Sequence, residues 1–146
     1  MNNGVIRYSL FVTGYSFRNP HSAIPIPPNP MRYDEYLEVD ALLKLQNGRS
    51  DGPEHDEMLF IIIHQVYELW FKQVLHEVDY LQGLLLADDT SRALHTLRRI
   101  LTILKTMVAQ VDILETMTPQ EFLSFRGYLD TASGFQSAQF RELEFA

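Results

Sequence analysis

Two pairs of residues in this chain have the side-chain types and the spacing needed to bind a small molecule. The first pair is Phe60 and His64, which lie four residues apart and therefore on one face of a helix. Isoleucines surround His64, and burial would favour its neutral imidazole, whose free nitrogen accepts a hydrogen bond from a ligand N–H. The same pattern also fits a core histidine that is hydrogen-bonded to Glu68, one turn further on, or to a backbone group.

The second pair is Phe122 and Arg126, which are again four residues apart. A guanidinium donates two parallel hydrogen bonds to a carboxylate, so Arg126 is a candidate anchor for an amino acid or another carboxylic acid. An ordinary ion pair with Asp130 or another acid is the alternative. Residues 131–134, which follow closely, would either offer backbone N–H groups and hydroxyls to a ligand or simply connect two helices.

Other common kinds of chemical site have no match in the sequence. The chain has no cysteine, which excludes disulfides, thiolate nucleophiles and cysteine-ligated metals. No two of its five histidines are three or four residues apart, and no Glu-x-x-His occurs. A metal site built by this chain alone is therefore not expected, and a glycine-rich phosphate loop and a nucleophile elbow are absent as well.

The elements that position these pairs are helices, because apolar residues recur at helical spacing from Tyr33 onward. A first helix of about 12 residues is expected to begin at Tyr33 and to end before the turn-rich segment 47–52. Amphipathic packing in this helix is the simplest explanation for the three-residue spacing of Tyr33 and Tyr36.

Two long helices are expected next. Asp51 or Gly52 is the predicted cap of the first, Pro53 its first residue, and Leu86 its approximate end. The second covers about residues 90–115. Its apolar stripe consists of Leu94, Leu97, Ile100, Leu101, Leu104, Val108, Val111 and Leu114.

A capping box from Thr118 to Glu121 predicts a short helix that continues to about Leu129. A loop at residues 130–134 and a last helix at residues 135–145 follow. The expected fold class is therefore all-α, a bundle of two long and several short helices. The helix after Pro53 is apolar on several sides, which implies more covering mass than one chain supplies and hence an oligomer.

The first 32 residues differ from the rest, because five prolines lie within residues 20–30. Proline fixes φ and lacks an N–H donor, so this arm should be irregular, with either a short strand at residues 5–12 or disorder there. The predicted division of the chain is thus an arm, residues 1–32, and a helical domain, residues 33–146.

Composition limits the function classes. The chain has 146 residues, 46% of them hydrophobic, as expected of one globular domain. A net charge of −7 disfavours nucleic acid as a partner. The longest apolar run, Met58 to Ile63, is far shorter than the roughly 20 residues needed to cross a membrane. No secretion signal is recognisable at the amino terminus, so a cytoplasmic location is expected.

Several stretches occur together in one known family. They are Tyr33-Asp34-Glu35-Tyr36-Leu37, His55-Asp56-Glu57-Met58-Leu59-Phe60-Ile61-Ile62-Ile63-His64-Gln65, Glu68-Leu69-Trp70, Leu114-Glu115-Thr116-Met117-Thr118-Pro119, Phe125-Arg126 and Ser133-Gly134-Phe135-Gln136-Ser137. Together they resemble the amino-terminal half of the tryptophan 2,3-dioxygenases, from about Tyr33 to Phe145.

The resemblance implies an all-α, haem-dependent (heme-dependent), homotetrameric enzyme. Such an enzyme inserts both atoms of dioxygen across the indole 2,3-double bond of L-tryptophan and so produces N-formylkynurenine. No metal ligand is implied within this chain, because the family's proximal haem histidine and a substrate-binding threonine lie in its carboxy-terminal half, which the match does not reach.

The resemblance also implies a role for individual residues. His64 corresponds to the distal histidine that meets the indole N–H, Phe60 and Phe122 to aromatic substrate contacts, and Arg126 to the arginine that binds the substrate carboxylate. The residues implied near haem and substrate are Leu129, Ser133 and Gly134, and those implied to reach into a neighbouring subunit's pocket are Tyr33, Tyr36 and Leu37.

Three functions therefore remain open for the chain. The first is a dioxygenase that takes its proximal haem ligand from a second chain or from an unexpected histidine, such as His76 or His95. The second is a non-catalytic helical module that binds an indole, an amino acid or a protein partner. The third is a truncated product without activity.

Overall fold

The computed structural model describes residues 31–52 and 54–146 of the chain. These residues form two separate units, of which residues 31–37 belong to the first and residues 38–146 to the second. The predicted arm, residues 1–32, lies almost wholly outside the described residues, so its expected irregular or strand structure stays a prediction. The elements are α1 (Tyr33–Tyr36), α2 (Val39–Leu42), α3 (His55–Leu86), α4 (Thr90–Leu114), α5 (Pro119–Arg126), η1 (Gly127–Leu129), η2 (Gly134–Gln136) and α6 (Ala138–Phe145).

All elements of the described residues are helical, so the predicted all-α class is confirmed. None of these helices is long and apolar enough to cross a membrane. The single first helix expected from Tyr33 is wrong, because the segment contains the two one-turn helices α1 and α2 instead. Glu38 between them has a left-handed φ of 50°, a backbone conformation that interrupts the helical hydrogen-bond ladder.

The long helix α3 begins at His55 with Glu54 as its cap residue, so the predicted cap at Asp51 or Gly52 is wrong. Pro53, the expected first residue, lies outside the described residues. The helix starts later than predicted because of Glu57 in its first turn. The buried carboxylate of Glu57 accepts hydrogen bonds from the backbone N–H groups of Arg49 and Ser50 at 2.6 and 3.3 Å. The preceding loop therefore folds over the helix start instead of continuing into it.

The Glu57 carboxylate makes the stability of this loop pH-dependent. The backbone N–H of Arg49 and the Ser50 hydroxyl hold the pKa of Glu57 below its ordinary value. A carboxylate with a lowered folded-state pKa stabilises the fold above its unfolded pKa, near 4.3, and this contribution is lost as the pH falls through the folded pKa. We expect Glu57→Gln to lower the free energy of unfolding by about 1–2 kcal/mol at neutral pH.

Urea denaturation of wild type and Glu57→Gln at a series of pH values from neutral to strongly acidic checks this expectation. The difference between the two proteins should shrink as the carboxylate protonates. Glu54→Gln, an exposed change three residues away, is the matched control and should stay within about 0.5 kcal/mol of wild type. A difference that persists unchanged at low pH contradicts the proposed role of the charge.

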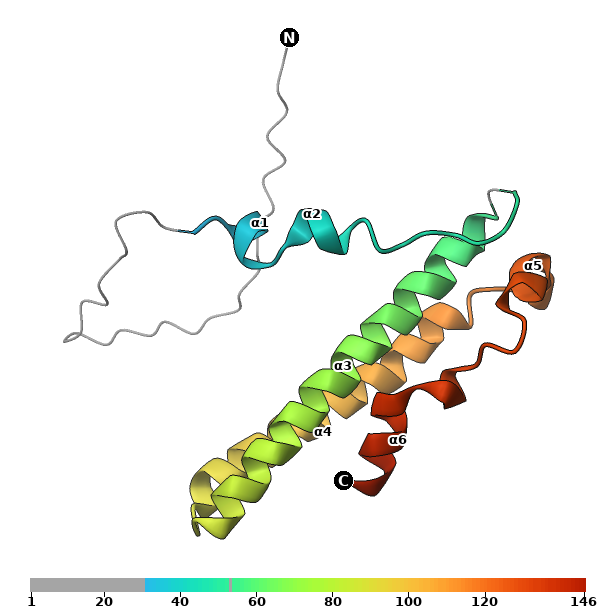
Figure 1. Ribbon diagram of the computed structural model, residues 1–146. Helices are drawn as coiled ribbons and strands as arrows, with labels where there is room; N and C mark the ends of the chain where they lie inside the picture. Colours follow the sequence, from blue (N-terminus) through green and yellow to red (C-terminus); the bar gives the residue numbers. More distant parts are fainter. Residues whose placement is uncertain (1–30, 53) are drawn as a thin grey trace. The chain divides into compact units, whose positions relative to one another are not determined.

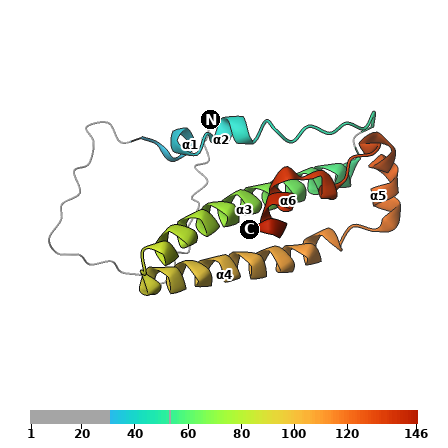
Figure 2. The ribbon, with the colours of Figure 1, turned by 60° about the horizontal axis from the view of Figure 1, so that its bottom comes forward.

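Helices α3 and α4 form an antiparallel hairpin, which Figures 1 and 2 show as two long helices side by side. The predicted end at Leu86 and the predicted start at Thr90 are confirmed, and the side chain of Asp89 caps the second helix by accepting from the N–H of Arg92. The core between the helices contains Val74, Leu81, Leu84, Ala93, Ile100, Ile103 and Met107.

The apolar stripe predicted for α4 is mostly not the face that packs on α3. Ile100 is buried, but Leu101, Leu104 and Val108 of the same stripe are exposed. The buried positions lie one residue earlier along the helix, as Ala93, Thr96 and Met107 illustrate. The helix therefore carries two apolar faces, of which α3 covers one.

The short helices complete the second unit. The capping box of α5 is confirmed, with the hydroxyl of Thr118 accepting from the N–H of Glu121 and the carboxylate of Glu121 accepting from the N–H of Thr118. The predicted helix to Leu129 ends as an α-helix at Arg126 and continues as the 3-10 turn η1. The last helix begins at Ala138 rather than residue 135 and packs against α3.

Candidate functional site

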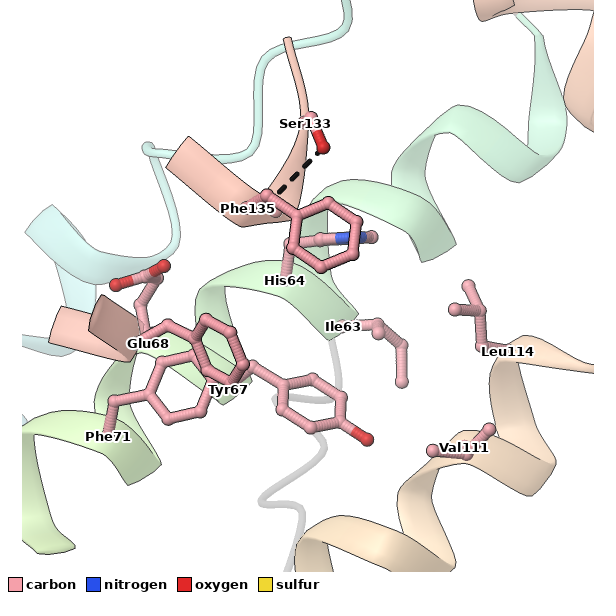
Figure 3. A pocket seen from close by; sticks show the side chains of 11 residues that line it. Ile63, His64, Tyr67, Glu68, Phe71, Val111, Leu114, Ser133 and Phe135 are labelled. Carbon is pink, nitrogen blue, oxygen red and sulfur yellow. Dashed lines mark hydrogen bonds between the residues drawn. The ribbon is translucent and has the colours of Figure 1, made fainter. Parts of the chain in front are cut away.

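Three pockets have His64 in their walls, and we call them the His64 pockets. The first, of about 350 Å³, is lined by residues of α3, α4, η2 and α6, and Figure 3 shows it from close by. The second, of about 240 Å³, lies between α3 and residues 129–137. The third, of about 410 Å³, lies between α3, the end of α4 and the start of α5. His64 is thus the side chain at which the three pockets meet.

The imidazole of His64 has a defined orientation. Its Nδ1 atom lies 2.7 Å from the backbone carbonyl oxygen of Phe60, one turn earlier. A carbonyl oxygen only accepts hydrogen bonds, so Nδ1 carries the proton and donates it. In the neutral ring the other nitrogen, Nε2, is then an acceptor. Of the alternatives that the sequence left open, a bond to a backbone group is the one found, while the ring still lines all three pockets.

Aromatic rings form one wall of the site. The rings of Phe60 and His64 have centroids 4.0 Å apart, and Phe122 lies 5.8 Å from Phe60. Phe125, which is completely buried, meets both phenylalanines edge-on at 5.5 Å. Such edge-to-face contacts are favourable for the ring quadrupoles, so this cluster fixes α5 against α3 and holds Phe122 in the wall.

Polar contacts hold the other walls. The side-chain amide of Gln139 on α6 donates to the backbone carbonyl and to the carboxylate of Glu68, at 3.0 and 2.8 Å. The hydroxyl of Tyr67 donates to the carbonyl of Met107 on α4 at 2.6 Å, and burial raises the pKa of this tyrosine. These contacts connect α4 and α6 to α3 within about one helical turn of His64.

The segment after α5 forms a further wall of the site. Nη1 of Arg126 donates to the backbone carbonyl of Asp130 at 2.9 Å, across the turn that ends the helix. Ser133 caps η2 by accepting from the N–H of Phe135. Ser133 and Phe135 both line the first His64 pocket together with His64 (Figure 3).

Comparisons with known proteins identify the family. The family model for tryptophan 2,3-dioxygenase matches residues 26–146. The tryptophan 2,3-dioxygenase of Herpetosiphon aurantiacus is 69% identical over 115 residues, which are 79% of this chain and 44% of that protein. This chain belongs to the tryptophan 2,3-dioxygenase family.

Further relatives of the same name are more distant. That of Anaeromyxobacter sp. (strain K) is 60% identical over 114 residues, which are 78% of this chain and 42% of that protein. That of Mayetiola destructor is 51% identical over 122 residues, 78% of this chain and 31% of that protein. The chain thus spans less than half the length of these tryptophan 2,3-dioxygenases.

Most of the residues that the sequence suggested for a tryptophan 2,3-dioxygenase site lie together. Of these predicted residues, the ones that line the His64 pockets are Phe60, His64, Phe122, Leu129, Ser133 and Gly134. Arg126 is not among the lining residues, and its contact is with the backbone of Asp130, so the alternative of an ion pair with the Asp130 carboxylate is wrong. Tyr33, Tyr36 and Leu37 are exposed and belong to the other unit, so their role stays a prediction.

Several lining residues were not singled out from the sequence. Tyr67 and Phe71 lie three and seven residues after His64 and so on the same face of α3, a spacing that could have revealed them. Val111 from α4 and Phe140 from α6 also line the first pocket, but nothing local in the sequence connects them to His64.

The chemistry of the walls around His64 suits the haem that the tryptophan 2,3-dioxygenase family implies. The walls around His64 are largely aromatic and aliphatic, as a flat apolar cofactor requires. Among the histidines at 55, 64, 76 and 95, His64 alone lines these pockets. Within residues 31–52 and 54–146, no group of three or more His, Cys, Asp or Glu side chains could hold a metal ion.

Proposed function

We propose that the His64 pockets form the indole-binding half of a tryptophan 2,3-dioxygenase site. In this proposal the chain takes part in the insertion of dioxygen into L-tryptophan, which yields N-formylkynurenine. The observation that supports the proposal most directly is the hydrogen bond from Nδ1 of His64 to the Phe60 carbonyl. It leaves Nε2 as an acceptor in a pocket of aromatic and aliphatic side chains.

His64 acts in this proposal by accepting the indole N–H. A buried donor without a partner is costly, so the Nε2 acceptor beside largely apolar walls favours a flat ring that carries an N–H. The same nitrogen is positioned to hold or receive the indole proton as the ring reacts. The Phe60 carbonyl keeps the imidazole in the tautomer that this role requires.

Phe60 and Phe122 orient the indole by contact with its faces and edges. Aromatic pairs contribute about 0.5–1.5 kcal/mol beyond the burial of area, and they exclude water from the ring. Phe125 supports both residues from behind without lining the pockets, since it is completely buried.

Arg126 is proposed to bind the substrate carboxylate. The Asp130 carbonyl accepts from Nη1, and the guanidinium has further N–H donors for a ligand. A two-pronged contact to a carboxylate fixes the orientation of an amino acid, and correct positioning removes part of the activation barrier.

Haem would supply the dioxygen chemistry when bound, and in this proposal Leu129, Ser133 and Gly134 lie beside it. These three residues line the pocket between α3 and the segment after α5. The iron ligand in this proposal is a residue other than His64, because His64 is assigned to the indole. The proposal also includes a homo-oligomer in which Tyr33, Tyr36 and Leu37 reach the pocket of a neighbouring subunit. It places the protein in the cytoplasm.

Titration with L-tryptophan and with 1-methyl-L-tryptophan, which lacks the indole N–H, tests the proposed site. Haem is first added to the purified protein, where a saturable Soret band is expected, and each amino acid is then titrated by calorimetry. We expect 1-methyl-L-tryptophan to bind at least about tenfold more weakly, because the His64 acceptor is then left unpaired.

Two variants separate the contributions of the side chains. His64→Ala should bind both amino acids with similar affinity, because the acceptor is gone. Arg126→Ala should weaken both to a similar extent, because both share the carboxylate. Equal binding of the two amino acids to wild type would contradict the role of His64, and binding that Arg126→Ala leaves unchanged would contradict the carboxylate contact.

A further inference from the structure

The turn between η1 and η2 contains a strained residue. Asp130 has a φ of 47° and a ψ of −116°, and the backbone carbonyl of Leu129 accepts a hydrogen bond from the N–H of Ala132 at 2.7 Å. Such a bond, together with these angles, is typical of a type II′ turn with Asp130 at its first central position. Glycine is the usual residue there, because the Cβ atom of any other residue crowds the backbone at these angles.

The residues on both sides of the turn line the His64 pockets. Four of them line the pocket between α3 and residues 129–137, namely Leu129 before the turn and Ala132, Ser133 and Gly134 after it. Ser133 also lines the first pocket, as Figure 3 shows. Only Asp130 and Thr131 separate the two parts of this wall, so the backbone angles of Asp130 determine how the two parts are placed relative to each other.

The guanidinium of Arg126 holds the strained residue from one side. Arg126 belongs to the last turn of α5, and its Nη1 donates to the carbonyl oxygen of Asp130 at 2.9 Å. A hydrogen bond from a charged donor is stronger than one between neutral groups. The direction of the Asp130 carbonyl follows from the ψ angle of this residue, so the bond acts directly on the strained part of the backbone.

Gln136 holds the turn from the other side. Its Nε2 donates to the carbonyl of Thr131 at 3.3 Å, and its Oε1 accepts from the N–H of Ser133 at the same distance. A strained backbone persists only where the surrounding contacts fix it, and such strain is concentrated at ligand sites and switch regions. The contacts of Arg126 and Gln136 therefore identify this turn as a fixed part of the pocket wall.

We propose that Arg126 and Asp130 are positioning residues of the His64 pockets. Arg126 acts through the Asp130 carbonyl, which keeps the turn in its strained form and so places Leu129 and Ser133 in the pocket wall. The inference rests on the proposed function for the identity of the ligand, an indole. It adds that Arg126 contributes to binding even where the ligand has no carboxylate.

Amide hydrogen exchange of the full chain, followed by NMR, tests the hold on the turn. Arg126→Ala should speed up exchange at the N–H groups of Ala132 and Gln136 about tenfold. The first of these groups closes the turn, and the second donates to the Ser133 carbonyl at 2.9 Å. Amides in the middle of α4 should stay slow, which shows that the variant is folded.

A glycine at residue 130 separates strain from other effects. Asp130→Gly combined with Arg126→Ala should restore most of the slow exchange, because glycine adopts the angles of Asp130 without strain. Thr131→Gly combined with Arg126→Ala is the matched control. Thr131 adjoins Asp130 but has no positive φ, so a glycine there adds flexibility without relieving strain and should restore nothing.

Binding of 3-methylindole to the haem-loaded protein tests the effect on the pockets. This ligand keeps the indole N–H but has neither a carboxylate nor a charge. We expect Arg126→Ala to weaken its binding at least about threefold, and the added Asp130→Gly to return it to within about twofold of wild type. L-Tryptophan should still bind more weakly to the double variant, because its carboxylate lacks the guanidinium.

Three results would overturn the inference. Unchanged exchange at Ala132 and Gln136 in Arg126→Ala would mean that the guanidinium does not hold the turn. Equal rescue by Asp130→Gly and Thr131→Gly would assign the effect to flexibility. Unchanged binding of 3-methylindole to a variant with faster exchange would mean that the turn does not position the wall. If wild type binds no indole at all, the proposed function is contradicted instead, and the exchange rates alone decide whether Arg126 and Asp130 hold this segment.

Discussion

Replacement of Phe125 by alanine is expected to lower the free energy of unfolding by about 3–5 kcal/mol, the range found for buried phenylalanines. Phe125 is fully inaccessible and contacts Phe60 and Phe122 edge-on at 5.5 Å. The change removes a whole ring from the junction between α5 and α3 and leaves a cavity there. Because Phe122 then loses its support, the wall of the third His64 pocket should be weakened as well.

Urea denaturation followed by circular dichroism measures the loss of stability. Leu123→Ala is the matched control, since this residue belongs to the same helix but is 67% exposed, and it should change the stability by no more than about 0.5 kcal/mol. Similar losses for the two variants would show that α5 is not held by the aromatic cluster.

Replacement of Arg99 by alanine is expected to cost about 2 kcal/mol of stability. Nη1 of Arg99 on α4 contacts both carboxylate oxygens of Glu77 on α3, at 2.9 and 3.1 Å. Glu77 is almost completely buried and also accepts from the amide of Gln73 at 2.7 Å. Without Arg99, the buried carboxylate of Glu77 keeps only the neutral amide of Gln73 as a partner. The expected cost is below the 3–5 kcal/mol of a fully buried pair, because the Arg99 side chain is half exposed and therefore screened by water.

Two further variants check this explanation. Arg98→Ala, next to Arg99 but outside the contact with Glu77, should stay within about 0.5 kcal/mol of wild type in urea denaturation. Glu77→Leu combined with Arg99→Leu should recover most of the lost stability, since no unpaired charge then remains between the helices. A double variant as unstable as Arg99→Ala would assign the effect to packing rather than to charge.

The helix ends with strong local signals could be predicted from the sequence. Thr118 and Glu121 cap α5 as expected, because the donors and acceptors involved lie within one turn of each other. The start of α3 could not be predicted in this way. The N–H groups of Arg49 and Ser50 bond to Glu57, and this competing set of bonds outweighs the local capping signal.

The break at Glu38 had no signal either, since neither glycine nor proline marks the left-handed residue. On α4, two apolar faces lie one residue apart, and periodicity alone does not tell which of them meets α3. The face of α3 that carries Phe60 and His64 was predictable because both residues belong to one helix. The contact of Gln139 with Glu68 joins residues 71 positions apart, and the sequence holds no local trace of it.

The three-residue connection between α3 and α4 has a consequence for the order in which the chain acquires its structure. Contacts near Leu84 and Ala93 close a very short loop, so the hairpin gains packing early at little cost in chain entropy. The His64 pockets lie toward the other end of the hairpin. Their walls also need α5 and α6, whose residues are much further from His64 along the chain. We therefore expect the His64 pockets to form late in folding, after the α3–α4 hairpin has packed.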